Sequence, residues 1–181
     1  MLVVPRTWAQ EIKFPKSFRA DASLFKGMRL AEIPKEIQVK NGIKKNPALI
    51  TEIAKTKGAL FTASTIGVKA IYLEIWKDPM IEKSDCGYEV AQFASIAELE
   101  KALPKFKSWF YGAILTVQNY LIVVKCVPST NAEQKIDKIA SYFQKKLGAK
   151  LFLDRKKEVE VAVTEDYVSN LPPPLPPKPK G

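Results

Sequence analysis

The sequence predicts an α+β domain: a mostly antiparallel sheet of about seven strands with two or three helices, followed by an extended proline-rich C-terminal tail. Three observations predict this. Short segments of alternating apolar and polar residues recur along the chain, which is the period of a strand. Two capping boxes, Ser or Thr followed three residues later by Glu, each precede a helical pattern. Six of the 13 prolines lie within residues 171–181, where they exclude a central strand.

The first elements are the least regular. Residues 1–27 combine Trp8 with three phenylalanines and two prolines without a clear period, which indicates an irregular N-terminal segment packed on the body. Residues 28–166 are expected to form a single α+β domain, because the chain length suits one domain. Its first strand-like stretch, residues 28–40, contains Pro34, and proline favours an edge position.

A short helix is predicted next. Asn46 is a favoured N-cap and Pro47 a favoured first helical residue, while Gly58 would end the helix. Strands are expected at 59–65 and 69–77. The alternation in the second strand predicts that both of its faces are covered, one carrying Ile71, Leu73 and Ile75 and the other Tyr72, Glu74 and Trp76.

The later elements have stronger signals, since both capping boxes and the turn Gln118-Asn119 belong to them. In chain order they are a loop at 78–87, a strand at 88–94, a helix from near Ile96, paired strands at 113–118 and 120–127, a helix at 131–147, and a hairpin of 150–153 and 158–164.

The composition excludes several classes of enzyme. The chain has no histidine, which removes Ser-His-Asp and Cys-His nucleophile systems, HExxH sites and Cys2His2 zinc sites. Its two cysteines cannot supply a four-ligand zinc site or a disulfide scaffold. No Walker loop, GxGxxG, GxSxG or CxxC motif occurs. We therefore predict no catalytic residue, no cofactor and no metal, with a histidine-free hydrolase as the remaining enzymatic alternative.

The net charge of +10 has two interpretations. It comes from 25 lysines and only four arginines, and lysine excess gives a diffuse, salt-sensitive attraction to RNA or DNA. The same lysine excess, with few thermolabile residues, is typical of hyperthermophile surfaces. If nucleic acid binds, the candidate contacts are the exposed basic turns and one aromatic stretch: Lys44, Lys45, Arg155, Lys156, Lys157, Lys105 and Lys107.

The aromatic stretch at 105–111 also has two interpretations. Lysines interleaved with aromatic residues are typical of platforms that stack single-stranded bases. Phe106, Trp109 and Phe110, however, share one face at helical spacing, which favours core packing.

One acidic cluster stands out in a chain whose net charge is positive. Asp78, Glu82, Asp85 and Glu89 lie within twelve residues, and carboxylates are ligands for Ca²⁺ or Mg²⁺. Their spacing fits no EF-hand, so a contact with a basic partner and a solvated loop are the other interpretations.

The sharpest feature is the tail, read as residues 167–181. Its sequence LPPPLPPKPKG favours polyproline II, whose preset backbone lowers the entropy cost of docking in an aromatic groove. The residues expected to contact a partner are Leu171, Pro173, Pro174, Leu175, Pro176, Pro177 and Lys178.

Two known motifs are similar to this tail. Residues 173–178 resemble the class II ligand of SH3 domains, PxxPx+, with Lys178 as the cation. The tail is also similar to the motif by which ESCRT-III proteins, including archaeal cell-division ones, engage the MIT domain of their ATPase, although Pro174 stands where that motif has an aliphatic residue. Both resemblances imply a partner domain that reads the tail. The alternatives are a tail that wraps a neighbouring subunit or ends in solvent.

Together these features predict a non-enzymatic accessory subunit of a larger ribonucleoprotein or nucleoprotein assembly, with a basic surface and a tail that docks a protein partner. An archaeal RNA-guided defence complex would be one such assembly. The alternative is an adaptor without a nucleic-acid role. We also expect a homo-oligomer. No apolar run reaches the roughly 18 residues that span a bilayer, and no signal peptide is visible, so the sequence predicts a cytoplasmic protein without membrane contact.

Overall fold

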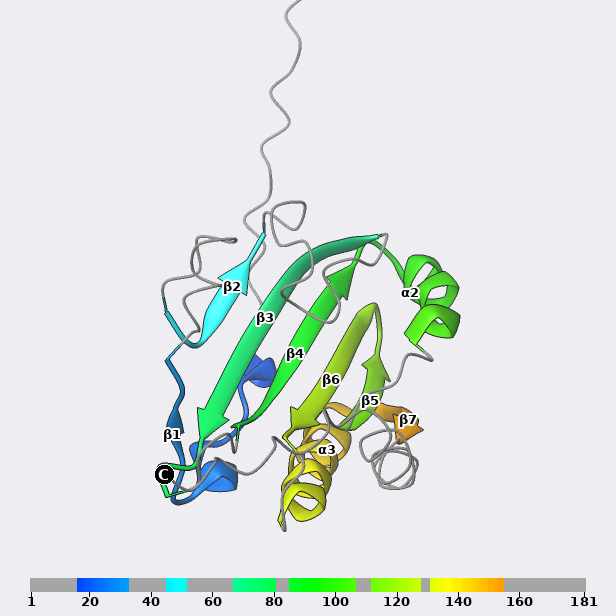
Figure 1. Cartoon of the computed structure of the whole chain (residues 1–181). Coiled ribbons are helices and arrows are strands. Elements are labelled where there is room, and N and C mark those ends of the chain that lie inside the picture. Colours follow the sequence, from blue (N-terminus) through cyan, green and yellow to red (C-terminus); the bar gives the residue numbers. More distant parts are fainter. Residues whose placement is uncertain are drawn as a thin grey trace, which may run out of the picture.

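The computed structural model describes residues 16–32, 45–51, 67–80, 85–106, 112–127 and 131–154. Within them lies a seven-stranded sheet in which every pairing is antiparallel (Figure 1). The strands are β1 (Arg29–Leu30), β2 (Ala48–Ile50), β3 (Val68–Lys77), β4 (Asp85–Phe93), β5 (Gly112–Val117), β6 (Tyr120–Cys126) and β7 (Lys150–Asp154). The helices are α2 (Ile96–Ala102) and α3 (Ala132–Leu147), with 3₁₀ turns η1 (Lys16–Phe18), η2 (Ala22–Phe25) and η4 (Leu103–Phe106). The predicted α+β class is confirmed.

The strand order is β1-β3-β4-β6-β5-β7, and β2 also pairs with β3. Side chains of β3 alternate between two apolar cores, as predicted. The first core packs the face bearing Ile71 and Leu73 against α2 and η4, and the second packs the face bearing Tyr72 against α3, η1 and η2. The sheet is therefore the middle layer, with α2 and α3 on opposite faces.

One predicted capping box is confirmed, and a glycine ends the other helix. The Ser95 hydroxyl accepts a hydrogen bond from the Glu98 N–H (3.2 Å) and so caps α2. Gly148 ends α3 at φ +66°, a left-handed conformation in which glycine carries no Cβ penalty. The second capping box, residues 130–133, predicts Thr130 as the N-cap, but the N-cap of α3 is Asn131, which makes no side-chain capping bond.

The helix predicted from Pro47 is wrong at its start, because residues 48–50 form strand β2. Ala48 and Ile50 are buried opposite β3 while Leu49 is exposed, so this segment has the two-residue period of a strand. Asn46 does not cap a helix. Its amide donates to the carbonyls of Ala31 (2.8 Å) and Ile75 (2.6 Å), so that it joins the chain after β1 to β3.

Several other expectations fall outside the described residues, namely the strands at 59–65 and 158–164, the segment 33–44, and the tail. The N-terminal segment is described from residue 16, where Phe18 and Phe25 are buried against the sheet. No helix of the described chain is long and apolar enough to cross a membrane.

Candidate functional site

The most concentrated polar chemistry in the described residues is a buried carboxylate on the α3 face of the sheet. Glu74 is only 3% exposed. Tyr72 and Tyr88 both donate their hydroxyls to Glu74 Oε2, at 2.6 and 2.7 Å, and Trp76 Nε1 donates to Oε1 at 2.8 Å. We call these four side chains the Glu74 network.

Strand geometry assembles the Glu74 network. Tyr72, Glu74 and Trp76 stand two residues apart on β3 and so share a face, while Tyr88 is the direct partner of Glu74 on β4. The two strands approach closely here, because a Cβ at Gly87 would overlap the Glu74 carbonyl. The network therefore depends on the β3–β4 register and on a glycine in β4.

The N-terminal segment covers the Glu74 network. The Ala20 N–H donates to the Tyr88 hydroxyl (2.8 Å), and the Phe25 ring stacks on Trp76 with centroids 4.5 Å apart. Tyr142 of α3 donates to the Arg19 carbonyl (3.0 Å). Hydrogen bonds and ring contacts thus join the segment to the sheet and to α3.

Burial and the Glu74 carboxylate both affect the tyrosines. Desolvation, reinforced by the hydrogen bond to Glu74, raises the pKa of Tyr72 to about 12. Desolvation and the charge of Glu74 also raise the pKa of Tyr88. A hydrogen bond with Tyr72 raises the pKa of Arg19. Both tyrosines therefore remain protonated donors at neutral pH.

A second buried acid lies on the α2 face of the sheet. Glu89 is 5% exposed, and its Oε1 forms an ion pair with Lys125 Nζ of β6 at 2.9 Å. Removing one partner of such a pair leaves an uncompensated buried charge, so the pair links β4 to β6 in a structural role.

Two acids of the predicted cluster, Asp78 and Glu89, pair with different lysines. Asp78 Oδ2 lies 3.9 Å from Lys135 Nζ of α3, whereas Glu89 is engaged with Lys125. Among the described residues, no group of three or more His, Cys, Asp or Glu side chains could hold a metal ion. Glu82 lies outside those residues.

The two cysteines form a disulfide that sequence reasoning missed. Cys86 of β4 and Cys126 of β6 are direct cross-strand partners. The neighbouring pair, Asp85 and Val127, shares a backbone hydrogen bond (2.8 Å), so the cysteines occupy a non-hydrogen-bonded position, where facing side chains come closest. The pairing follows from the register, which the spacing of the cysteines does not reveal.

Of the predicted basic contacts, Lys45 and Lys105 lie within the described residues. Lys45 is exposed, and Lys105 lies in η4 with a side chain outside the described set. Lys44, Lys107, Arg155, Lys156 and Lys157 fall outside the described residues, as do all the partner-binding residues of the tail. Phe106 is buried beside α2, in agreement with the core interpretation of its stretch.

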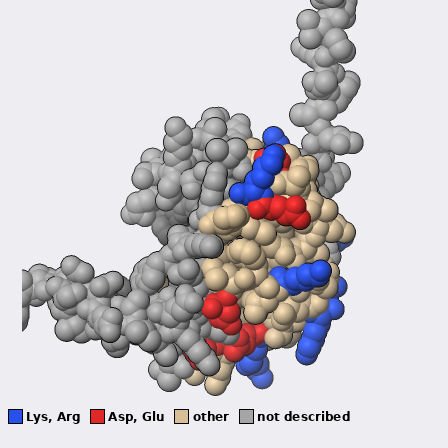
Figure 2. All heavy atoms as spheres, turned by 90° about the vertical axis from the view of Figure 1, so that its right-hand side faces the viewer, with Lys and Arg blue, Asp and Glu red and all other residues tan. Residues whose placement is uncertain are grey.

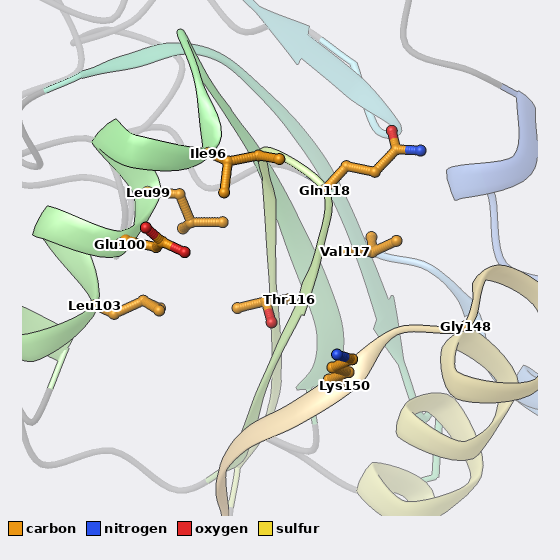
Figure 3. A pocket seen from close by; sticks show the side chains of 9 residues that line it. All are labelled: Ile96, Leu99, Glu100, Leu103, Thr116, Val117, Gln118, Gly148 and Lys150. Atoms are coloured by element: carbon orange, nitrogen blue, oxygen red, sulfur yellow. The ribbon is translucent and has the colours of Figure 1, made fainter.

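A groove of about 360 Å³ separates α2 from the β5–β7 edge of the sheet (Figure 3). Leu99 and Glu100 of α2 and Leu103 of η4 extend toward Thr116 of β5, and Lys150 of β7 lines the opposite side. None of the Glu74 network lines it.

Comparison with models of protein families, with curated proteins and with solved structures finds no match for this chain.

Proposed function

We propose that the protein is a non-enzymatic accessory subunit of a larger nucleoprotein assembly. Its folded body would carry dispersed basic side chains toward nucleic acid, and its tail would dock a protein partner. We further propose that it self-associates and acts in the cytoplasm. A disulfide is compatible with that compartment in a hyperthermophile, whose intracellular proteins are disulfide-rich.

The observation that carries the proposal is how the buried acids are used. A general acid or base needs access to substrate and a proton to exchange. The Glu74 carboxylate instead accepts three hydrogen bonds under the N-terminal segment, and Glu89 is paired with Lys125. Both acids hold strands and segments together, which supports a scaffold for binding.

The charge supports the nucleic-acid part of the proposal. Lysine-rich surfaces attract the phosphate backbone without reading bases, and the chain carries a net charge of +10. The exposed lysines Lys45, Lys138 and Lys145 are available for such contacts.

The adaptor without a nucleic-acid role is the second candidate, and one observation favours it. On the face seen in Figure 2, basic side chains of the described residues stand in separate groups, with acidic side chains beside some of them. A dispersed pattern gives weaker attraction than a continuous basic groove.

Nucleic-acid binding separates the two candidates. We expect single-stranded RNA to bind at 50 mM salt, with affinity falling roughly 50-fold at 200 mM if about four phosphates are neutralised. Fluorescence anisotropy of a labelled strand measures this. The variant Lys44→Glu/Lys45→Glu should bind several-fold more weakly than the matched control Lys16→Glu/Lys26→Glu, which makes the same change of charge on the N-terminal segment.

An absence of binding at low salt to RNA and DNA, single- and double-stranded alike, would reject the nucleoprotein proposal in favour of the adaptor. Equal weakening by the two double variants would reject Lys44 and Lys45 as the contact.

A further inference from the structure

The groove between α2 and the sheet is largely apolar. Leu99 is buried at its base, Leu103 is half-buried, and Ile96 at the start of α2 is 54% exposed. An apolar side chain so exposed beside a hollow leaves area that an occupant could remove from water.

The two walls of the groove carry opposite charges. Glu100 is exposed on the α2 wall, and Lys150 is exposed on the β7 wall (Figure 3). An apolar ligand with a cation at one point would fit with that cation against α2, away from Lys150. The groove therefore favours an apolar segment that carries a positive charge on one side.

We infer that residues 171–178 of the same molecule occupy this groove in the free protein. The segment is apolar apart from Lys178, and its five prolines have no N–H groups that would need acceptors in an apolar groove. Leu175 would lie against Ile96, and the alkyl part of Lys178 would lie against Leu103 with its ammonium group near Glu100.

The spacing of the segment agrees with that of the groove. In polyproline II, residues three apart share an edge and lie about 9 Å apart, so Pro172, Leu175 and Lys178 form one edge. On α2 and its continuation, Ile96 and Leu103 are seven residues apart, a rise of about 10 Å if helical geometry holds throughout. Two successive residues of the edge can thus meet both apolar side chains.

The linker between β7 and the tail segment is long enough to let the segment reach the groove and short enough to keep it nearby. Residues 155–170 join β7 to the segment, and sixteen residues can reach at most about 53 Å. The far end of β7 lies about 13 Å from Lys150, which lines the groove. Tethering at this range gives an effective concentration near the millimolar range, so a docking affinity of about 1 mM already fills the groove about half of the time.

This inference rests on the proposed function in one respect: Leu175 and Lys178 are also the residues that a partner domain would read. Docking in the groove would hide them, and a partner would have to bind the undocked tail. The apparent affinity for the partner would equal the affinity for the free tail multiplied by the fraction of molecules whose tail is undocked.

Paramagnetic relaxation in the full-length chain tests the docking. A nitroxide on Lys180→Cys should strongly broaden the methyl signals of Ile96 and Leu103. The Val127 methyls, about 23 Å along β6 from its start near the groove, should keep theirs. Glu100→Lys should restore the Ile96 and Leu103 signals, and adding Lys178→Glu should broaden them again.

Isotope mixing shows whether the docked tail belongs to the same molecule or to another copy. The spin-labelled chain without isotope is mixed with the isotope-labelled chain without a spin label. Broadening in this sample equal to that in the doubly labelled chain would mean docking between copies and would overturn the inference. Equal broadening at Ile96 and Val127, or no effect of Glu100→Lys in a variant of unchanged melting temperature, would also overturn it.

Failure here differs from failure of the proposed function. A tail that never contacts the groove but still recruits a partner leaves the proposed function standing. A docked tail in a protein that binds neither nucleic acid nor a partner leaves only the docking.

Discussion

Replacing Glu74 with alanine is expected to lower the free energy of unfolding by about 4 kcal/mol. The substitution leaves the hydroxyls of Tyr72 and Tyr88 and the indole N–H of Trp76 without their acceptor, and each buried donor without a partner costs about 1–3 kcal/mol. Urea unfolding followed by circular dichroism measures the change.

A matched control uses an acid that lies on the surface. Glu32→Ala, just after β1, should change stability by less than about 0.5 kcal/mol. Tyr88→Phe should also destabilise, because it removes both a donor to Glu74 and the acceptor for the Ala20 N–H. The double variant Glu74→Ala/Tyr88→Phe should lose less than the sum of the two single losses. A loss below about 1 kcal/mol for Glu74→Ala would contradict the structural role of the Glu74 network.

Reduction of the Cys86–Cys126 disulfide is the second large effect, with an expected loss of about 4 kcal/mol. The two cysteines are 40 residues apart, and closing a loop of that length removes much of the entropy of the unfolded chain. Urea unfolding of the oxidised and reduced protein compares the same side chains, so that the cross-link is the only difference.

Two observations test whether the Cys86–Cys126 cross-link causes this loss of stability. Cys86→Ala/Cys126→Ala should unfold at the same urea concentration with and without reductant. The oxidised protein, unfolded without reductant, should present no thiol to a thiol reagent. Two reactive thiols in that assay would show that the cross-link is absent and remove the basis for the predicted loss.

The sheet could be predicted from sequence wherever local and tertiary preferences agree. β3 has a strong period-two pattern, the turn Gln118-Asn119 separates the apolar runs of β5 and β6, and α3 has a strong helical period. The helix prediction for the segment after Asn46 failed because its capping signals are local, whereas its structure depends on pairing with β3. Asn46 satisfies backbone groups of the sheet rather than of a helix.

The buried sites were harder to predict because they depend on register. The shared face of Tyr72, Glu74 and Trp76 could be predicted, and a carboxylate between two aromatic residues on a covered face was the available signal. That Tyr88 lies opposite Glu74, and Cys86 opposite Cys126, follows from pairing across strands, which no local pattern specifies. The groove likewise joins α2 to β7, segments about 50 residues apart in sequence.

The role as an accessory subunit is tested most directly by the mass and content of the native complex. Light scattering after size exclusion of the protein from its host should give a mass well above the 20.3 kDa of one chain, with nucleic acid that nuclease releases. Leu175→Asp/Lys178→Glu should remove the protein partner but leave the nucleic acid bound. A 20.3 kDa monomer free of nucleic acid, with wild type and variant alike, would contradict the account.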